Sequence, residues 1–335
     1  MTSTARNVVA TLSLIVALGA ALPAAAKTPW GSNAPEGFIP PPLHPAGVEL
    51  QTKKLAPGVY ALLSNEIAVD NSGFIVGERG VLVIDAHING AMARQIQDAV
   101  KRVTAKPILY LVNTNYHGDH TFGNYAFPAD TRIIAHRKTA ERMRNFEYEK
   151  RSMLATVNND AGVFADARLR LPDVVFDDYL RVDLGGRVVE LYHFGPGNTP
   201  GDTVVYAPEA KIAWTGNLVV GVGPIPPIFE GGAGHYLETI ARFHTTLDVQ
   251  TIVPGHGALT TGAILGRYLD YLSNLIGSVR EAVHRGQSLD ETLAGLPLSP
   301  DYTPAAATLG SSLADFVVGL HKLNVQQTYR DFAAR

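Results

Sequence analysis

The feature that most constrains this chain is the polar segment Asn113-Thr-Asn-Tyr-His117-Gly-Asp119-His120, which directly follows the apolar run Ile108–Val112. A short apolar run with polar flanks is typical of a buried strand, and residues 92–103 have the spacing of a helix with one buried face. The sequence therefore predicts a strand-helix-strand unit that delivers a polar loop. Histidine and aspartate are ligand types for divalent metal ions, so this loop is a candidate metal site.

A second candidate element, Pro254-Gly255-His256-Gly257, follows the predicted strand Thr251–Val253. The two glycines allow the backbone to bring His256 close to another loop. The chain has no cysteine, which excludes disulfides and thiolate ligands. Any metal must therefore be held by His, Asp, Glu or Asn.

Both elements resemble parts of the metallo-β-lactamase-fold hydrolases, whose signature is His-x-His-x-Asp-His on the loop after a buried strand. Two further segments resemble loops of that family, Gly195-Pro-Gly-Asn198-Thr-Pro-Gly and Trp214-Thr-Gly-Asn217-Leu. The resemblance covers roughly residues 48–262. It implies an α/β protein, an αββα sandwich, with additional C-terminal helices.

The resemblance implies that the first metal position is weak or lost. Family members hold that metal with three histidines, at places that match Asn115, His117 and Asn198, and a bridging aspartate stands where this chain has Asn217. A carboxamide oxygen is a neutral and weak ligand. We therefore expect no tightly held metal at this position.

The second metal position is intact, since the resemblance assigns it to Asp119, His120 and His256. These residues would hold one metal ion per chain, expected to be zinc, and leave a fourth place for water. Asp85 resembles an aspartate at the end of an early strand, from which it is expected to hydrogen-bond a ligand loop. Two histidines and a carboxylate also suit iron, which is the less favoured metal.

Two functions remain open. The first is a metal-dependent hydrolase of a small-molecule amide, lactone or ester, with a β-lactam among the candidates. In it Asp119 acts at the metal, His117 is the general base, and Asn115 and Asn198 donate hydrogen bonds to His117, to substrate or to an oxyanion. The alternative is an exported pseudoenzyme that keeps the fold and binds a ligand or partner without hydrolysis. The replacement of three family positions by asparagine is compatible with both.

The chain divides by composition into four parts. Residues 1–26 contain the apolar run Val8–Leu22 and end in Ala24-Ala-Ala26, which predicts a cleaved signal peptide rather than an uncleaved anchor. A lead-in rich in proline and glycine spans residues 27–47. The metallo-β-lactamase-like domain is expected to span residues 48–262, and residues 263–335 are expected to form a helical extension that packs on this domain. We expect an exported protein, periplasmic or secreted, with no membrane span after cleavage. The net charge of −3 gives no sign of a nucleic-acid partner, so a small-molecule substrate is the default.

Strand and helix patterns occur twice, once in each half of the predicted domain. His87 and His193 follow strand patterns and are predicted to be structural, while the apolar loop 221–234 is expected to wall the substrate pocket. The charged stretch 137–151 is predicted to be a solvated helix. The predicted strands are 59–63, 74–76, 81–84, 108–112, 179–182, 188–194, 203–206, 212–214 and 251–253, and the later helices run over 235–247, from 264 to 283 and through 313–320.

Overall fold

The computed structural model of the protein describes residues 42–230, 232–302 and 311–334. The predicted signal peptide and most of the predicted lead-in lie outside these residues. At the end of the lead-in, Leu43 is buried and its N–H donates to the carbonyl of Thr156 at 2.7 Å. Among the described helices, none combines the length and the apolar character that a membrane crossing requires.

The first sheet has seven strands that lie side by side in chain order. The neighbours from β1 to β4 pair antiparallel, whereas β4, β5, β6 and β7 run parallel. Helix α1 (Gly90–Val103) makes the crossover between β4 and β5, and Asn89 caps it by accepting from the N–H of Met92. The strands are β1 (Leu50–Ala56), β2 (Val59–Ser64), β3 (Ser72–Val76), β4 (Val81–Ile84), β5 (Ile108–Asn113), β6 (Arg132–His136) and β7 (Val174–Phe176).

The second sheet has five strands in the order β12-β11-β10-β9-β8. Only the pair β11 and β12 is parallel, because α5 (Ala233–Thr246) makes the crossover between these two strands. The other neighbours pair antiparallel. The strands are β8 (Tyr179–Asp183), β9 (Val188–Tyr192), β10 (Val204–Ala207), β11 (Ile212–Trp214) and β12 (Thr251–Val253).

Alternating side chains of the strands enter two different cores. In β4, Val81 and Val83 pack towards α1, whereas Leu82 and Ile84 join the core between the two sheets. Both sets are fully buried, which is why this strand reads as a continuous apolar run. From the second sheet, Trp214 enters the same inter-sheet core.

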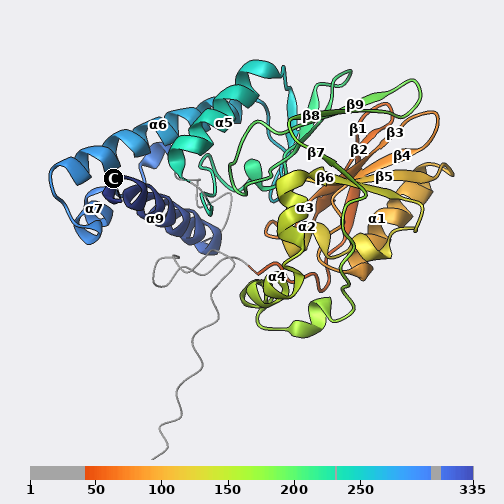
Figure 1. The fold of residues 1–335 in the computed structure, drawn as a ribbon, viewed down its shortest axis with the longest axis horizontal. Coiled ribbons are helices and arrows are strands. Elements are labelled where there is room, and N and C mark those ends of the chain that lie inside the picture. The colour runs from red at the N-terminus through yellow and green to blue at the C-terminus, as the bar shows by residue number, and fades with distance from the viewer. Residues whose placement is uncertain (1–41, 231, 303–310, 335) are drawn as a thin grey trace, which may run out of the picture.

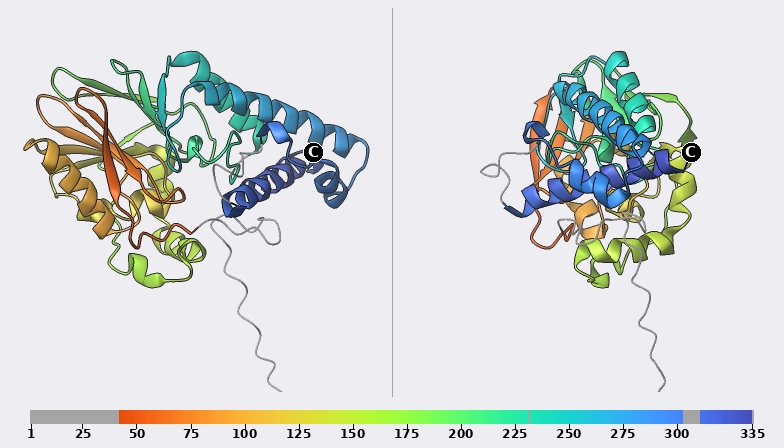
Figure 2. Two further views of the ribbon diagram at one scale, coloured as in Figure 1. Left: turned by 180° about the vertical axis from the view of Figure 1, so that it is seen from behind. Right: turned by 90° about the vertical axis from the view of Figure 1, so that its left-hand side faces the viewer.

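Helices cover the outer face of each sheet. Helix α1 packs on the first sheet and α5 on the second, while α6 (Ala263–His284) and α9 (Ser311–Ala333) extend the same outer core, with α9 against α6 and α5. Figure 1 shows these two groups of helices on opposite sides of the sheets, and the view from behind in Figure 2 shows the same arrangement. The predicted αββα sandwich with additional C-terminal helices is thereby confirmed. The shorter helices are α2 (Gly118–Thr121), α3 (Arg137–Met143), α4 (Phe146–Met153), α7 (Leu289–Gly295), η1 (Asn124–Ala126), η2 (Leu154–Val157), η3 (Ala161–Phe164), η4 (Gly216–Leu218) and η5 (Pro300–Tyr302).

Candidate metal centre

Polar side chains follow four strands at the point where each strand ends. Asp85 follows β4, the segment 114–120 follows β5, Asn217 follows β11 and His256 follows β12. Because β4 and β5 run parallel, as do β11 and β12, their carboxyl ends lie at the same edge of each sheet. Gly255 makes the approach of the last loop possible, since a Cβ there would lie 2.7 Å from Oδ1 of Asn217.

Four side chains at this edge, Asp70, Asp119, His120 and His256, form a cluster in which one ligand atom of each lies within 4.8 Å of all the others. Nε2 of His256 is 3.0 Å from Oδ1 of Asp70 and 3.6 Å from Oδ2 of Asp119. Nε2 of His120 is 3.7 Å from the same oxygen of Asp70. The structure thus brings the three predicted ligands together and adds Asp70, which the sequence analysis missed.

The hydrogen bonds of the His256 ring leave its Nε2 facing the cluster without a proton. Nδ1 lies 2.8 Å from the backbone carbonyl of Ala68, which can only accept, so Nδ1 carries the hydrogen. Burial lowers the pKa of His256 to about 4, so the ring is neutral near pH 7. A nitrogen lone pair therefore faces the carboxyl group of Asp70, and either a proton or a metal ion between them would satisfy both groups.

The ring of His120 is oriented in the same way by Asp85. Its Nδ1 lies 2.9 Å from Oδ2 of Asp85, and Asp85 is held in turn by the N–H and hydroxyl of Thr114 at 2.8 Å and 2.7 Å. Such a carboxylate behind a histidine fixes the ring for metal binding at Nε2. Burial alone would lower the pKa of His120, but the carboxylates of Asp70, Asp85 and Asp119 raise it well above its usual value. A proton and a metal ion therefore compete for Nε2.

The cluster is buried and contains carboxylate oxygens that have no hydrogen-bond partner among the described residues. Neither carboxylate oxygen of Asp70 accepts a hydrogen bond from any described donor, and the same holds for Oδ1 of Asp119. Burial, together with the neighbouring carboxylate of Asp119, raises the pKa of Asp70 well above its usual value. Since unpaired buried carboxylates cost free energy, the arrangement favours a bound cation.

The spacing of the donor atoms fits a divalent metal ion. A tetrahedral zinc ion with bonds of about 2.0–2.1 Å has its ligand atoms about 3.3–3.4 Å apart. Three of the six separations, 3.0, 3.6 and 3.7 Å, lie around that value, and one ligand atom of each residue lies within 4.8 Å of the others. Aspartate oxygens and imidazole nitrogens are also the donors that zinc takes in proteins without cysteine ligands.

The asparagines at the predicted first metal position bond to protein groups instead. Oδ1 of Asn115 accepts from the N–H of His117 at 2.9 Å, and Nδ2 of Asn198 donates to the carbonyl of Pro227 at 3.0 Å. Asn217 lies between two imidazoles, with Nδ2 3.2 Å from Nδ1 of His117 and Oδ1 3.1 Å from Nε2 of His120. The amide that donates to the His117 ring is therefore that of Asn217, whereas the sequence analysis had considered Asn115 and Asn198 for this role.

His117 lies beside the cluster as a neutral imidazole. Burial lowers its pKa to about 4. If Nδ1 accepts from Asn217 as the geometry indicates, the hydrogen of the ring is on Nε2. The predicted role of general base at Nε2 requires the opposite tautomer, with the Asn217 amide turned around.

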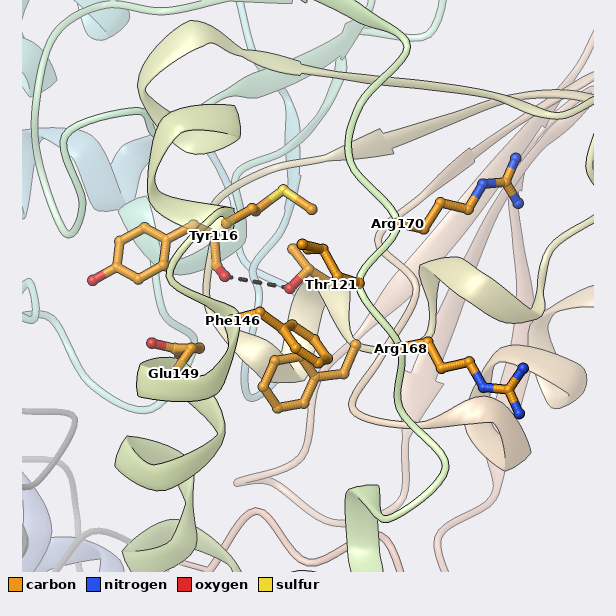
Figure 3. A pocket seen from close by; sticks show the side chains of 9 residues that line it. Tyr116, Thr121, Phe146, Glu149, Arg168 and Arg170 are labelled. Atoms are coloured by element: carbon orange, nitrogen blue, oxygen red, sulfur yellow. Dashed lines mark hydrogen bonds between the residues drawn. The ribbon is translucent and has the colours of Figure 1, made fainter.

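A buried carboxyl group supports the loop that carries Asp119. Oε1 of Glu149, on α4, accepts from the N–H of Gly118 at 3.1 Å. Burial raises the pKa of Glu149 to about 8. Figure 3 shows this side chain beside Tyr116 and Phe146, next to a cavity of about 10 Å³ that has room for one water at most. The charged stretch 137–151 was predicted to form a solvated helix face, and Glu149 is a charged residue of that stretch that is buried instead.

The C-terminal helix α9 is hydrogen-bonded to the segment 226–228. Nδ2 of Asn324 donates to the carbonyl of Pro226 at 2.8 Å, and its Oδ1 accepts from the N–H of Ile228 at 3.1 Å. Between these two bonds lies Pro227, whose carbonyl accepts from Asn198. The fully buried Asn324 thus connects the helix, through this segment, to one of the asparagines at the predicted first metal position.

Neither of the other histidines considered in the sequence analysis belongs to the four-residue cluster. His193 donates from Nδ1 to the carbonyl of Asp202 at 2.8 Å and stacks on His136 with ring centroids 3.8 Å apart. His87 is fully buried in a left-handed backbone conformation, and its ring nitrogens have no hydrogen-bond partner among the described residues. Burial lowers the pKa of His87 to about 3.

Comparisons with known proteins agree with the geometry. A curated relative, the 2,4-dinitroanisole O-demethylase subunit alpha of Nocardioides sp. (strain JS1661), is 28% identical over 184 residues, which are 54% of this chain and 51% of the relative. The match thus spans about half of the relative's length.

Two solved structures are similar in fold. The inverting sec-alkylsulfatase Pisa1 from Pseudomonas sp. has a TM-score of 0.65 and 17% identity, over 84% of this chain and 50% of that chain. A metallo-β-lactamase from Pontibacter korlensis has a TM-score of 0.53 and 18% identity, over 68% of this chain and 100% of that chain. The family model of the metallo-β-lactamase superfamily matches residues 69–256, which include all four residues of the cluster. The chain therefore belongs to the metallo-β-lactamase superfamily.

Proposed function

We propose that this protein is a metal-dependent hydrolase with one zinc ion per chain, which cleaves an amide, lactone or ester bond in a small molecule. The observation that carries the proposal is the convergence of two imidazoles and two carboxyl groups, in which both oxygens of Asp70 and Oδ1 of Asp119 have no hydrogen-bond partner among the described residues. The hydrogen bonds to Ala68 and Asp85 orient both rings so that Nε2 faces the cluster.

When bound, the metal ion would supply Lewis acidity that polarises a carbonyl oxygen and acidifies a water molecule. The chain would present this centre to substrate from the side of Asp119 and His256, whose side chains are 7% and 13% exposed. Asp70 and His120 are fully enclosed behind them. His117 lies on the same loop as Asp119 and would donate a hydrogen bond from Nε2 to a substrate oxygen in the tautomer that Asn217 favours.

The relatives point to several substrate classes rather than one. Their names refer to an aryl methyl ether, a secondary alkyl sulfate and, by class, a β-lactam. Because the curated relative matches over about half its length and the structural neighbours share less than a fifth of their residues, none of these substrates transfers directly. They define the panel on which the proposal is tested.

The test is hydrolysis of a panel of β-lactams, lactones, carboxylic esters, alkyl sulfates and 2,4-dinitroanisole. We expect turnover of at least one compound, loss of that turnover with a chelator, and recovery when zinc is returned. The His120→Ala variant should be inactive, and His193→Ala is the matched control, because His193 is a packed histidine outside the cluster. Zinc-loaded protein that hydrolyses no compound of the panel would count against the proposal.

The pseudoenzyme is the second candidate, and one observation favours it. Asn115, Asn198 and Asn217 are buried and each bonds to a protein group, so uncharged amides stand at the first metal position of the family, although Nδ2 of Asn115 and Oδ1 of Asn198 have no partner among the described residues. In that case the zinc-loaded protein would bind a member of the panel, measured by calorimetry, without converting it.

We also propose that the protein is exported, on the basis of the apolar run and the small residues that end at Ala26. Mass spectrometry of the protein recovered from its native cells would test this. A chain that begins at Lys27 is expected, and a chain that retains residues 1–26 would contradict the proposal.

A further inference from the structure

The position of Asp70 is fixed by the pairing of β3 with β4. These strands run antiparallel, with Gly73 opposite Ile84, so the residues before β3 lie beside the residues that follow β4. Asp70 also forms an isolated antiparallel bridge with His256. The backbone therefore holds the carboxylate of Asp70 against the imidazole of His256.

The next residue, Asn71, connects this segment to the His256 loop. Its backbone N–H donates to Gly255 at 2.6 Å, and its Nδ2 donates to the carbonyls of Pro254 and Gly257 at 3.0 Å and 2.8 Å. The side chain of Asn71 is buried, so these bonds are shielded from water. Asp70 is thus as well positioned as a residue of the His256 loop itself.

The bridging aspartate of the family is replaced by Asn217 in this chain, so one expected carboxylate is missing beside His120. Asn217 places its Oδ1 3.1 Å from Nε2 of His120, but an amide carries no charge. Oδ1 of Asp70 lies 3.7 Å from the same nitrogen and 3.0 Å from Nε2 of His256. Asp70 therefore offers a carboxyl oxygen to both imidazoles, where Asn217 offers an amide oxygen to one.

We propose that Asp70 is the fourth metal ligand and replaces the carboxylate that this chain lacks at Asn217. This inference rests on the proposed metal site. It changes the chemistry expected there, because two imidazoles and two carboxylates complete a tetrahedron and carry two negative charges in place of one. A metal ion held by these four residues would have no permanently open ligand position, so a substrate atom or a water molecule would have to bind as an additional ligand or in place of Asp70.

The test compares metal binding by the wild-type protein and Asp70→Asn, which keeps the size of the side chain and removes its charge. Zinc affinity is measured by competition with a chromophoric chelator, and coordination by the visible absorption of the cobalt(II)-loaded protein. The matched control is Asp202→Asn, because Asp202 is equally buried but bonds to Thr199 outside the cluster. Loss of a ligand is expected to weaken binding by about 100-fold or more.

A rescue variant keeps the inference testable if Asp70→Asn is unstable without metal. In Asp70→Asn/Asn217→Asp the carboxylate returns on the other side of His120, within reach of the metal position. We expect zinc affinity within about tenfold of wild type and recovery of an intense four-coordinate cobalt spectrum. Failure of this double variant to bind zinc more tightly than Asp70→Asn would contradict the proposed exchange of carboxylates.

The outcomes separate this inference from the proposed function. If wild type and Asp70→Asn bind cobalt with the same affinity and spectrum, the inference is wrong and the metal site stands with three protein ligands. Asp70 would then hold a proton against His256 instead of a metal ion. If the wild-type protein binds neither zinc nor cobalt, both the inference and the proposed metal site are wrong.

Discussion

The buried carboxyl group of Glu149 makes the stability of the metal-free protein depend on pH, and Glu149→Gln should remove that dependence. Glutamine keeps an oxygen that can accept from the N–H of Gly118, which Glu149 accepts at 3.1 Å, and it carries no charge at any pH. Burial raises the pKa of Glu149 from 4.5 to about 8. The folded state therefore strongly prefers the neutral acid.

The sign follows from proton binding. Between pH 4.5 and about 8 the native state binds one more proton at this site than the unfolded state, so the free energy of unfolding falls as pH rises. Each pH unit in that window is worth about 1.4 kcal/mol, so the cost at pH 7 is about 3 kcal/mol. Glu149→Gln is accordingly expected to be more stable than wild type at pH 8 and close to wild type at pH 4.5.

Urea unfolding, followed by circular dichroism in the presence of a chelator, measures this difference at both pH values. The matched control is Glu147→Gln on the same helix, because Glu147 is exposed and its substitution should change stability little at either pH. The reasoning would be refuted if the advantage of Glu149→Gln over wild type grew by less than about 1 kcal/mol between pH 4.5 and pH 8.

Three further substitutions test other parts of the site. Asp85→Asn should weaken zinc binding by about 10- to 100-fold, measured by chelator competition, because it removes the carboxylate that orients His120; unchanged affinity would contradict this role. His117→Ala should abolish turnover and leave the zinc content unchanged, as measured by elemental analysis, whereas equal loss of zinc would make His117 a ligand. Asn324→Ala should lower the free energy of unfolding in urea by about 1–3 kcal/mol, because the carbonyl of Pro226 and the N–H of Ile228 lose their partner. An effect below about 0.5 kcal/mol would show that these two hydrogen bonds do not stabilise the fold.

Much of the fold can be predicted because most strands are short apolar runs bounded by polar residues. Strand β1 is an exception, since four of its residues from Gln51 to Lys54 are exposed at the edge of the sheet and give no apolar run. Strands β6 and β7, with five and three residues, were not predicted either. They form because they extend a parallel sheet that β4 and β5 begin.

The candidate site is only partly readable from the sequence, for reasons of topology. Asp119, His120 and His256 stand in motifs, and the structure places them in one cluster. Asp70 stands in no motif and reaches the cluster through the antiparallel pairing of β3 and β4, which only the register reveals. Glu149 was missed because it stands in a stretch of charged residues of which Glu147 and Arg151 are exposed, so its burial against the loop that carries Asp119 leaves no pattern in the local sequence.

The central claim, a single metal ion held by the cluster, is tested most directly by the zinc content of protein purified without chelator. Inductively coupled plasma mass spectrometry should find about one zinc per chain in the wild type and in the His193→Ala control, and almost none in His256→Ala. Absence of metal from the wild type, even after zinc is supplied, would contradict the claim. So would two zinc ions per chain, because the asparagines at positions 115, 198 and 217 would then have to serve as ligands.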